Sequence, residues 1–190
     1  MGTSIAPGIL LAAPSLRCPF FERTVVLLVD HSAEGSFGFV VNKLTDMKLT
    51  HVFEQLDIPK PWHSPIGEKV LLGGPVSTDT GWILFDPRSA TQADIELARP
   101  IADGISCCAS TTMIERIAAG DGPTRNFMVL GYAGWGAGQL DEELVSGSWF
   151  PVDLDIELLF DVSPDARWAA AYDMLGVDPS RVIDTGMTSA

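Results

Sequence analysis

Short apolar runs separated by turn residues dominate the chain, and they predict a protein rich in β-strands. Residues 8–13 form one such run, closed by Pro14, and residues 24–29 form another that is β-branched or apolar almost throughout. A run without polar alternation is typical of a strand covered on both faces, so the second run is predicted to be central. The polar stretch 30–35 and the run 37–41 complete a predicted hairpin.

Further strands are predicted at 69–72, 81–85 and 104–108. The first two flank a polar turn and predict a second hairpin. Helical spacing is present in three places. Apolar residues at 49, 52, 53 and 56 share one helical face. Thr112 and Glu115 have the spacing of a capping box, with Gly120 at the helix end.

The last predicted helix has the strongest boundary signals. Ser163 suits the N-cap, Pro164 suits the first helical position, and Gly176 suits the end. Its buried stripe is predicted to be Trp168, Tyr172 and Leu175. The tail 180–190 has little apolar content and is expected to fray.

The stretch 131–144 has the least ordinary composition in the chain. It follows the apolar run 126–130 and holds four glycines in its first eight residues before an acidic, amphipathic segment. This pattern predicts a buried strand that breaks into a glycine turn and restarts as a short helix. Glycine permits positive φ and close approach, so either a ligand or Trp135 with the neighbouring sheet is expected to press against the turn.

Composition limits the classes of function. With 190 residues, 46% of them hydrophobic, the chain fits a single domain, 1–190. A net charge of -13 and the scattered basic residues disfavour direct nucleic-acid binding. The apolar runs are too short to span a bilayer, and the N-terminus lacks the basic region of a signal peptide. Three cysteines, two of them adjacent, do not form a disulfide framework, so a cytoplasmic protein is expected.

Several motifs in order resemble the YqgE/AlgH family of bacterial proteins over nearly the whole chain, from Gly8 to about Gly176. The motifs are Pro19-x-Phe21-x-Arg23 with the following apolar run, His31, Gly35-x-x-Gly38, Asn42, the segments 73–76 and 131–140, and Trp149. The resemblance implies an α+β fold, a single domain whose mixed β-sheets form an open, barrel-like core flanked by helices. It implies no established catalytic activity or cofactor, although some members carry the label of transcriptional regulator.

This chain departs from the family pattern at two places. Cys18 stands where the family usually has an aspartate, and Lys43-Leu44 stand where it tends to have Arg-Pro. Any role carried by that acid or that arginine is therefore in question for this protein.

Five residues are candidate ligand-binding positions: Arg23, His31, Asn42, Trp135 and Gln139. His31 follows a core strand, but a general base needs a nucleophile within hydrogen-bond reach, and the sequence has no G-x-S-x-G. A histidine satisfied by a turn carbonyl is the structural alternative.

For the glycine turn and for the adjacent cysteines, the sequence favours a structural role over phosphate or metal binding. The glycine turn matches neither dinucleotide nor P-loop spacing, and the acids after it repel an anion. Cys107 and Cys108 lack nearby partners with metal-ligand spacing, so two core side chains are favoured. The sequence therefore predicts no catalytic residue, metal ligand or cofactor.

The leading hypothesis is a non-enzymatic cytoplasmic domain that binds an unknown protein or small molecule, with an indirect regulatory role. The first alternative is a ligand sensor or enzyme, in which Arg23, His31, Asn42 and Gln139 converge on one cavity. The second is a transcriptional regulator that contacts DNA directly, which the net charge disfavours. The sequence does not indicate an oligomeric state.

Overall fold

The computed structural model describes residues 4–63 and 69–182, and the contacts divide the chain into two compact units. The first unit comprises residues 1–43 and 133–190, and the second comprises residues 44–132. Of the tail predicted to fray, residues 183–190 lie outside the described residues, and 179–182 form a short helix. That a single domain spans residues 1–190 stays a prediction.

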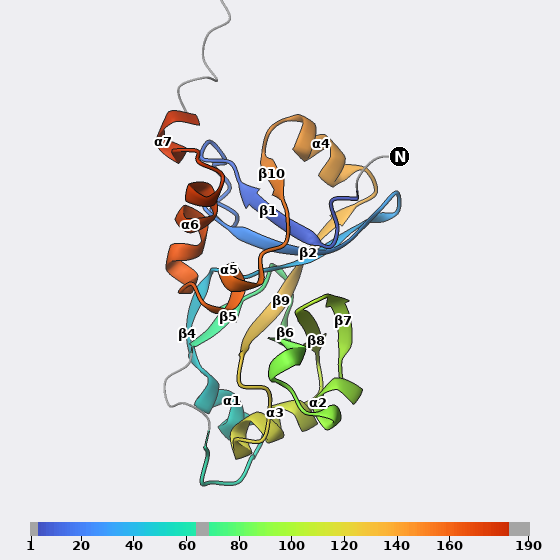
Figure 1. Ribbon diagram of the computed structural model, residues 1–190, viewed down its shortest axis with the longest axis vertical. Coiled ribbons are helices and arrows are strands. Elements are labelled where there is room, and N and C mark those ends of the chain that lie inside the picture. The colour runs from blue at the N-terminus through green and yellow to red at the C-terminus, as the bar shows by residue number, and fades with distance from the viewer. Residues whose placement is uncertain (1–3, 64–68, 183–190) are drawn as a thin grey trace, which may run out of the picture. The chain divides into compact units, whose positions relative to one another are not determined.

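The first unit contains four whole strands, the end of a fifth, and four α-helices (Figure 1). These elements are β1 (Gly8–Ala12), β2 (Val25–Ser32), β3 (Gly35–Val40), the end of β9 (Asn126–Gly136), α4 (Gln139–Val145), β10 (Trp149–Val152), α5 (Ile156–Phe160), the 3-10 helix η2 (Pro164–Ala166), α6 (Arg167–Met174) and α7 (Pro179–Val182).

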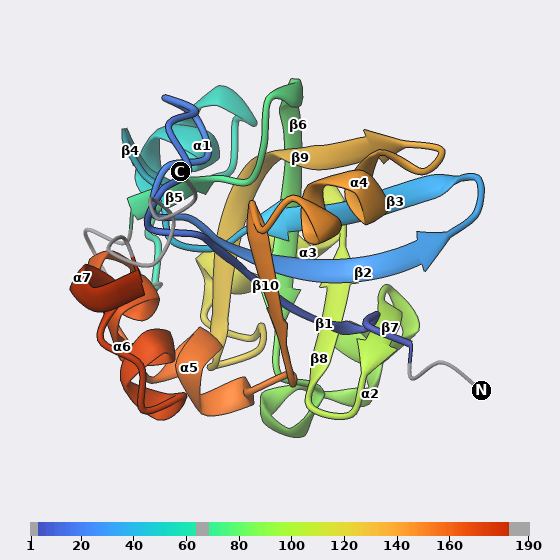
Figure 2. The same ribbon diagram turned by 90° about the horizontal axis from the view of Figure 1, so that it is seen from above.

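The strands of the first unit form an antiparallel sheet in the order β10-β1-β2-β3-β9. In Figure 2 strands β2 and β3 lie side by side. Residues 25–28 of β2 are buried, and β2 has a partner on each side, which confirms its predicted central place. The predicted hairpin is also confirmed, since β2 and β3 pair from Val26 with Val40 to Ser32 with Gly35.

Helix α6 docks on this sheet through two aromatic hydrogen bonds. Trp168 Nε1 and Tyr172 Oη both donate to the Ala12 carbonyl, at 2.9 and 3.0 Å. The last predicted helix is thus confirmed in place, although it begins with the 3-10 turn η2. Leu175 is 46% exposed, so the prediction that it completes the buried stripe is wrong. Beside this interface Arg167 is buried, and burial lowers the pKa of its guanidinium to about 10.

The second unit contains five whole strands, the start of β9 and three α-helices (Figure 1). These elements are β4 (Leu44–Lys48), α1 (Leu49–Gln55), β5 (Lys69–Leu72), β6 (Val76–Phe85), the 3-10 helix η1 (Pro87–Ser89), α2 (Gln92–Glu96), β7 (Arg99–Ala102), β8 (Ile105–Cys108) and α3 (Thr111–Ala119).

The sheet of the second unit is mixed. Strands β9, β6, β8 and β7 are antiparallel neighbours in that order, whereas β5 runs parallel to β9 and antiparallel to β4. Strands β5 and β6 do not pair with each other. The predicted second hairpin is therefore wrong, because both runs take β9 as their partner instead of each other.

Helices α1 and α3 cover the core of the second unit. Leu49, Val52 and Phe53 are buried as predicted, but Leu56 is 39% exposed. The N-cap of helix α3 lies two residues earlier than the predicted capping box at Thr112 and Glu115. Its N-cap is Ser110, whose hydroxyl accepts from the Thr112 amide at 3.2 Å. Gly120 ends the helix at φ 83°, as predicted.

The glycine-rich stretch differs from its prediction in one respect. Strand β9 does not break at Gly131 but continues to Gly136, and only then does the chain turn into α4. Gly131 has φ 71°, and a Cβ there would lie 2.7 Å from the Val76 carbonyl oxygen and 2.8 Å from that of Gly74. The expected close approach is therefore confirmed, and the backbone of Gly74 and Val76, in the same polypeptide, makes it.

Candidate functional site

Glu143 organises the helix that follows the glycine turn. Its carboxylate accepts from the indole N–H of Trp149 at 2.7 Å, from that of Trp135 at 3.0 Å, and from Gln139 Nε2 at 2.9 Å. Gln139 Oε1 in turn accepts from the Gly136 amide at 3.0 Å. Trp135 is only 6% exposed, so this network fixes α4 to the sheet through the predicted residues Trp135 and Gln139.

His31 lies between a hydroxyl and a carboxylate. Its Nδ1 is 2.8 Å from Ser36 Oγ on the paired strand β3, and its Nε2 is 3.4 Å from Asp141 Oδ1 on α4. The histidine side chain is 19% exposed and that of Asp141 is 60% exposed. The sequence did not single out Ser36 or Asp141, although the register of the predicted hairpin brings Ser36 opposite His31.

Arg23 and Asn42 meet at the opposite end of β2. Asn42 Nδ2 donates to the Arg23 carbonyl and Asn42 Oδ1 accepts from the Val25 amide, both at 2.8 Å. Arg23 has φ 53°, and its guanidinium lies 5.3 Å from the Trp168 ring centroid. Both residues line a cavity of about 490 Å³ together with α6 and the start of α7.

The structure thus separates the candidate residues into two groups. Arg23 and Asn42 share one cavity, whereas His31, Trp135 and Gln139 lie around α4. Along β2, six residue steps from Val25, which Asn42 contacts, to His31 separate the groups by roughly 20 Å, at about 3.3 Å per strand residue. One cavity lined by Arg23, His31, Asn42 and Gln139 is therefore not formed, and a ligand-binding role for each residue stays a prediction.

Of the residues that depart from the family pattern, Lys43 holds the segment before β2 in place. Lys43 Nζ donates to the carbonyls of Phe20, at 2.6 Å, and Pro19, at 3.3 Å, and lies 4.3 Å from the Phe20 ring centroid. Burial lowers the pKa of Lys43. Cys18 is half-buried and free, and Leu44 is 43% exposed.

The adjacent cysteines behave as core residues. Cys107 and Cys108 are each 4% exposed, and burial raises the pKa of both thiols. Both are therefore weak nucleophiles at neutral pH. Within residues 4–63 and 69–182, no group of three or more His, Cys, Asp or Glu side chains is placed to hold a metal ion.

A groove on the second unit was not found from the sequence. Two depressions, of about 560 and 530 Å³, share Met47 and Gln55 in their walls. The second has an apolar lining made by Met47, Val52, Leu56, Ile114, Met128 and Leu130. The polar residues Thr78, Asp79, Thr80 and Thr111 also line it, and the first depression adds His51 and Glu54. Five separate elements contribute, β4, α1, β6, α3 and β9, so no local motif marks the site.

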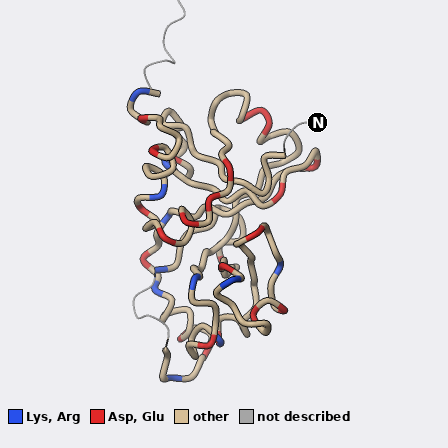
Figure 3. Tube along the Cα trace, viewed as in Figure 1, with Lys and Arg blue, Asp and Glu red and all other residues tan. Residues whose placement is uncertain are grey.

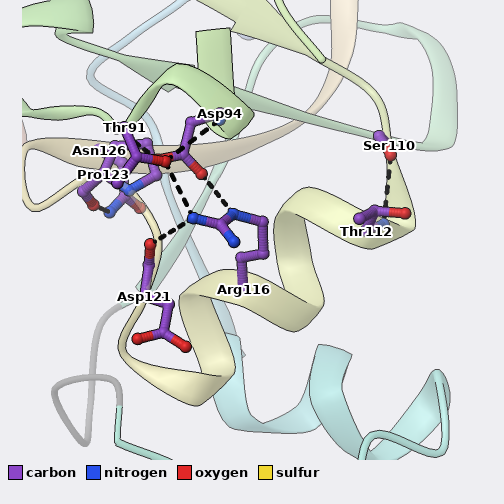
Figure 4. Close-up of polar contacts among 8 residues, drawn as sticks. All are labelled: Thr91, Asp94, Ser110, Thr112, Arg116, Asp121, Pro123 and Asn126. Carbon is purple, nitrogen blue, oxygen red and sulfur yellow. Dashed lines mark hydrogen bonds and ion pairs between the residues drawn. The ribbon is translucent and has the colours of Figure 1, made fainter. Parts of the chain in front are cut away.

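Two buried carboxylates stabilise the second unit. Asp94 has no exposed surface and accepts from Arg116 Nε at 2.6 Å and from the amide and hydroxyl of Thr91 at 2.7 and 2.8 Å (Figure 4). Asp86 is 1% exposed and pairs with Arg88 at 2.9 Å and with Arg125 at 2.8 Å. We assign these pairs a role in stabilising the fold and not in a binding site, because each carboxylate already accepts hydrogen bonds from its neighbours.

These pairs predict a loss of stability in acid. Hydrogen bonds from Arg88 hold the pKa of Asp86 below its ordinary value, and for Asp94 the hydrogen bonds from Arg116 and Thr91 together outweigh a burial effect that acts in the opposite direction. A depressed carboxyl pKa contributes stability above about pH 4, and this contribution is lost as the pH falls through the folded-state pKa.

Urea unfolding of the protein and of Asp86→Asn, between about pH 6 and pH 3, measures this effect. We expect the free energy of unfolding to fall less steeply with decreasing pH in the variant. If the free energy of unfolding fell equally steeply with decreasing pH in both proteins, Asp86 would not contribute to the loss of stability in acid.

Comparison with known proteins shows which family this chain belongs to. The AlgH-like family profile, DUF179, matches residues 9–180. A UPF0301 protein of Bordetella pertussis is 36% identical over 94% of this chain and 87% of its own length. A UPF0301 protein of Paraburkholderia phytofirmans is 37% identical over 90% of this chain and 88% of its own length.

Solved structures agree with the sequence relatives. The solution structure of the AlgH protein from Pseudomonas aeruginosa matches with a TM-score of 0.76 and 33% identity, over 100% of both chains. A crystal structure of a protein from Corynebacterium diphtheriae shares the fold, with a TM-score of 0.72 and 21% identity over 92% of this chain and 89% of its own. The expected fold class, α+β with mixed sheets in an open, barrel-like core flanked by helices, is confirmed.

The protein therefore belongs to the AlgH-like family, and the resemblance found in the sequence is confirmed. The family names carry no biochemical activity. Within the described ranges 4–63 and 69–182, no helix has the length and apolar character required to cross a membrane.

Proposed function

We propose that this protein is a cytoplasmic binding domain that recognises a short segment of a partner protein in the groove on the second unit. The observation that carries the proposal is Leu56, which belongs to the apolar stripe of α1 yet is 39% exposed and lines the groove. An exposed apolar surface with a polar rim is typical of an interaction site. The two methionines in the wall, Met47 and Met128, suit it to side chains of different shapes.

The charges at the groove define the partner. Asp79 lines one depression and Glu54 lines the other. Glu54 pairs with Lys60 at 3.6 Å, in an exposed ion pair that a ligand can replace at little cost. Basic residues are scattered singly among acidic ones along the described chain (Figure 3), and the net charge is -13. We therefore propose a partner segment with an apolar anchor side chain flanked by Lys or Arg.

The free cysteines and the charge support the rest of the proposal. All three cysteines are unpaired, as in the reducing cytoplasm. An acidic domain that binds basic segments of other proteins would regulate indirectly, without contacting DNA. Some family members carry the label of transcriptional regulator, and the negative net charge favours this indirect form of regulation over direct DNA binding.

A peptide array tests the proposal. The array carries short peptides of equal length with one central Leu, Met or Phe, flanked either by Lys and Arg or by Asp and Glu. We expect the purified protein to bind the basic-flanked peptides and to release them as salt is added, because the attraction is electrostatic. Equal binding to both sets, or to neither, would contradict the proposal.

Matched variants locate the site. Ala109 is exposed and lines the groove, so Ala109→Trp is expected to fill it and abolish binding, whereas Ala119→Trp, exposed on α3 outside the groove lining, is expected to bind normally. Asp79→Lys is expected to weaken binding, and Asp103→Lys, an equal change of charge at another exposed position, is expected to weaken it less. Undiminished binding by Ala109→Trp would exclude the groove.

A further inference from the structure

The first unit holds a serine, a histidine and an aspartate in contact, contributed by three elements. Ser36 on β3 and His31 on β2 are cross-strand partners, with 2.8 Å between Ser36 Oγ and His31 Nδ1. Asp141 on α4 approaches the other ring nitrogen, with 3.4 Å between Asp141 Oδ1 and His31 Nε2. A hydroxyl bonded to a base that a third group orients is the structural signature of an activated nucleophile.

We propose that Ser36 is a nucleophilic serine for carboxylic esters, with His31 as its general base and Asp141 as the residue that positions His31. With its proton on Nε2, the ring faces the Asp141 carboxylate with a donor, and the Nδ1 lone pair accepts the Ser36 hydroxyl proton. Relative to the Ser-His-Asp proteases the two ring nitrogens exchange roles, which leaves the chemistry of proton transfer unchanged.

The reaction needs only water as a co-reactant. Ser36 Oγ bonds to the ester carbonyl carbon while His31 takes the hydroxyl proton. The bond between that carbon and the alcohol oxygen then breaks, and His31 returns the proton to the departing oxygen. His31 then takes a proton from water, whose oxygen bonds to the acyl carbon. The bond between that carbon and Ser36 Oγ breaks, the carboxylic acid leaves, and His31 returns the proton to Ser36 Oγ. The net change is ester and water to acid and alcohol.

The surroundings favour Ser36 over other nucleophiles. Ser32 lies on the same hairpin, but its hydroxyl donates to the Gly35 carbonyl at 3.3 Å. Cys107 and Cys108 are buried thiols. The half-buried Ser36 and the 19% exposed His31 leave the pair accessible to a reagent. This activity goes beyond the binding role proposed above and does not depend on it, because all three residues belong to the first unit.

Covalent labelling with a fluorophosphonate tests the proposal on the full chain. Ser36 Oγ would attack phosphorus, the P–F bond would break, and fluoride would leave, giving an adduct that peptide mass mapping locates. We expect the adduct on Ser36, its absence in Ser36→Ala, and normal labelling in Ser32→Ala. His31→Asn is expected to lower the labelling rate by about 100-fold or more, the usual contribution of a general base. Asp141→Asn should lower it less, and Glu142→Gln should leave it unchanged.

Two results would overturn the proposal. One is a protein that carries no adduct on Ser36 although circular dichroism shows that it is folded. The other is a folded His31→Asn variant that labels at the original rate, which would make the contact between His31 and Ser36 structural. A Ser36 adduct whose formation depends on His31 would support an enzymatic role, in place of the non-enzymatic domain expected from the sequence.

Discussion

Replacing Arg116 by alanine is expected to lower the free energy of unfolding several times more than breaking an exposed ion pair does, because it removes the cation from a buried carboxylate. Asp94 has no exposed surface, and Arg116 Nε approaches it to 2.6 Å. Removal of the arginine leaves a buried carboxylate that still accepts from Thr91 but has lost its cation. Arg116 also donates to the Asp121 carbonyl at 2.8 Å, so the turn after α3 loses a contact as well.

Urea unfolding, with Arg17→Ala as the matched control, measures this loss. Arg17 pairs with Glu22 at 3.6 Å, but both side chains are largely exposed, and we expect a cost of about 0.5 kcal/mol or less. Adding Asp94→Asn to Arg116→Ala should recover part of the loss, because the neutral amide needs no cation. Similar losses for Arg116→Ala and Arg17→Ala would show that the buried pair is not a major source of stability.

Gly131→Ala is expected to cost about 3 kcal/mol or more, because two penalties combine. At φ 71° a side chain strains the backbone, and the new Cβ would meet two carbonyl oxygens within 2.8 Å. Those carbonyls belong to Val76 and Gly74, and backbone cannot rotate away as a side chain can.

Gly138→Ala separates the two penalties. Gly138 has a similar φ of 72°, but a Cβ there would meet nothing within 4 Å. We expect a cost of about 1 to 2 kcal/mol from strain alone. Thermal and urea unfolding of both variants give the comparison. Equal losses would mean that the contacts around Gly131 give way and that only its dihedral angle matters.

Local patterns predicted the elements of this fold better than their pairing. The apolar run of β2 and the caps of the last helix are local signals, and both elements are found where expected. Strand β5 was also found, but its partner was wrong, because β5 pairs with β9 more than fifty residues later in the chain. A polar turn between two runs carries no information about such a distant partner.

The candidate sites show the same limit. His31 was singled out, but a nearby nucleophile was sought through a sequence motif, whereas Ser36 reaches it across a strand pair and Asp141 reaches it from α4. The groove could not be predicted at all, since its lining comes from residues between 47 and 130. Leu56 and Leu175 fit helical stripes, yet they are 39% and 46% exposed, because a periodic pattern does not show where the apolar face of a helix stops being covered.

Amide chemical-shift mapping tests the central claim most directly. The ¹⁵N-labelled protein is titrated with the basic-flanked peptide that the array selects, and each shifted amide is assigned. Binding in the groove predicts shifts in α1, at the start of β6 and at the start of α3, the elements that supply Leu56, Asp79 and Thr111. Shifts confined to the first unit, around Arg23 and Asn42 or around His31 and α4, would contradict the account.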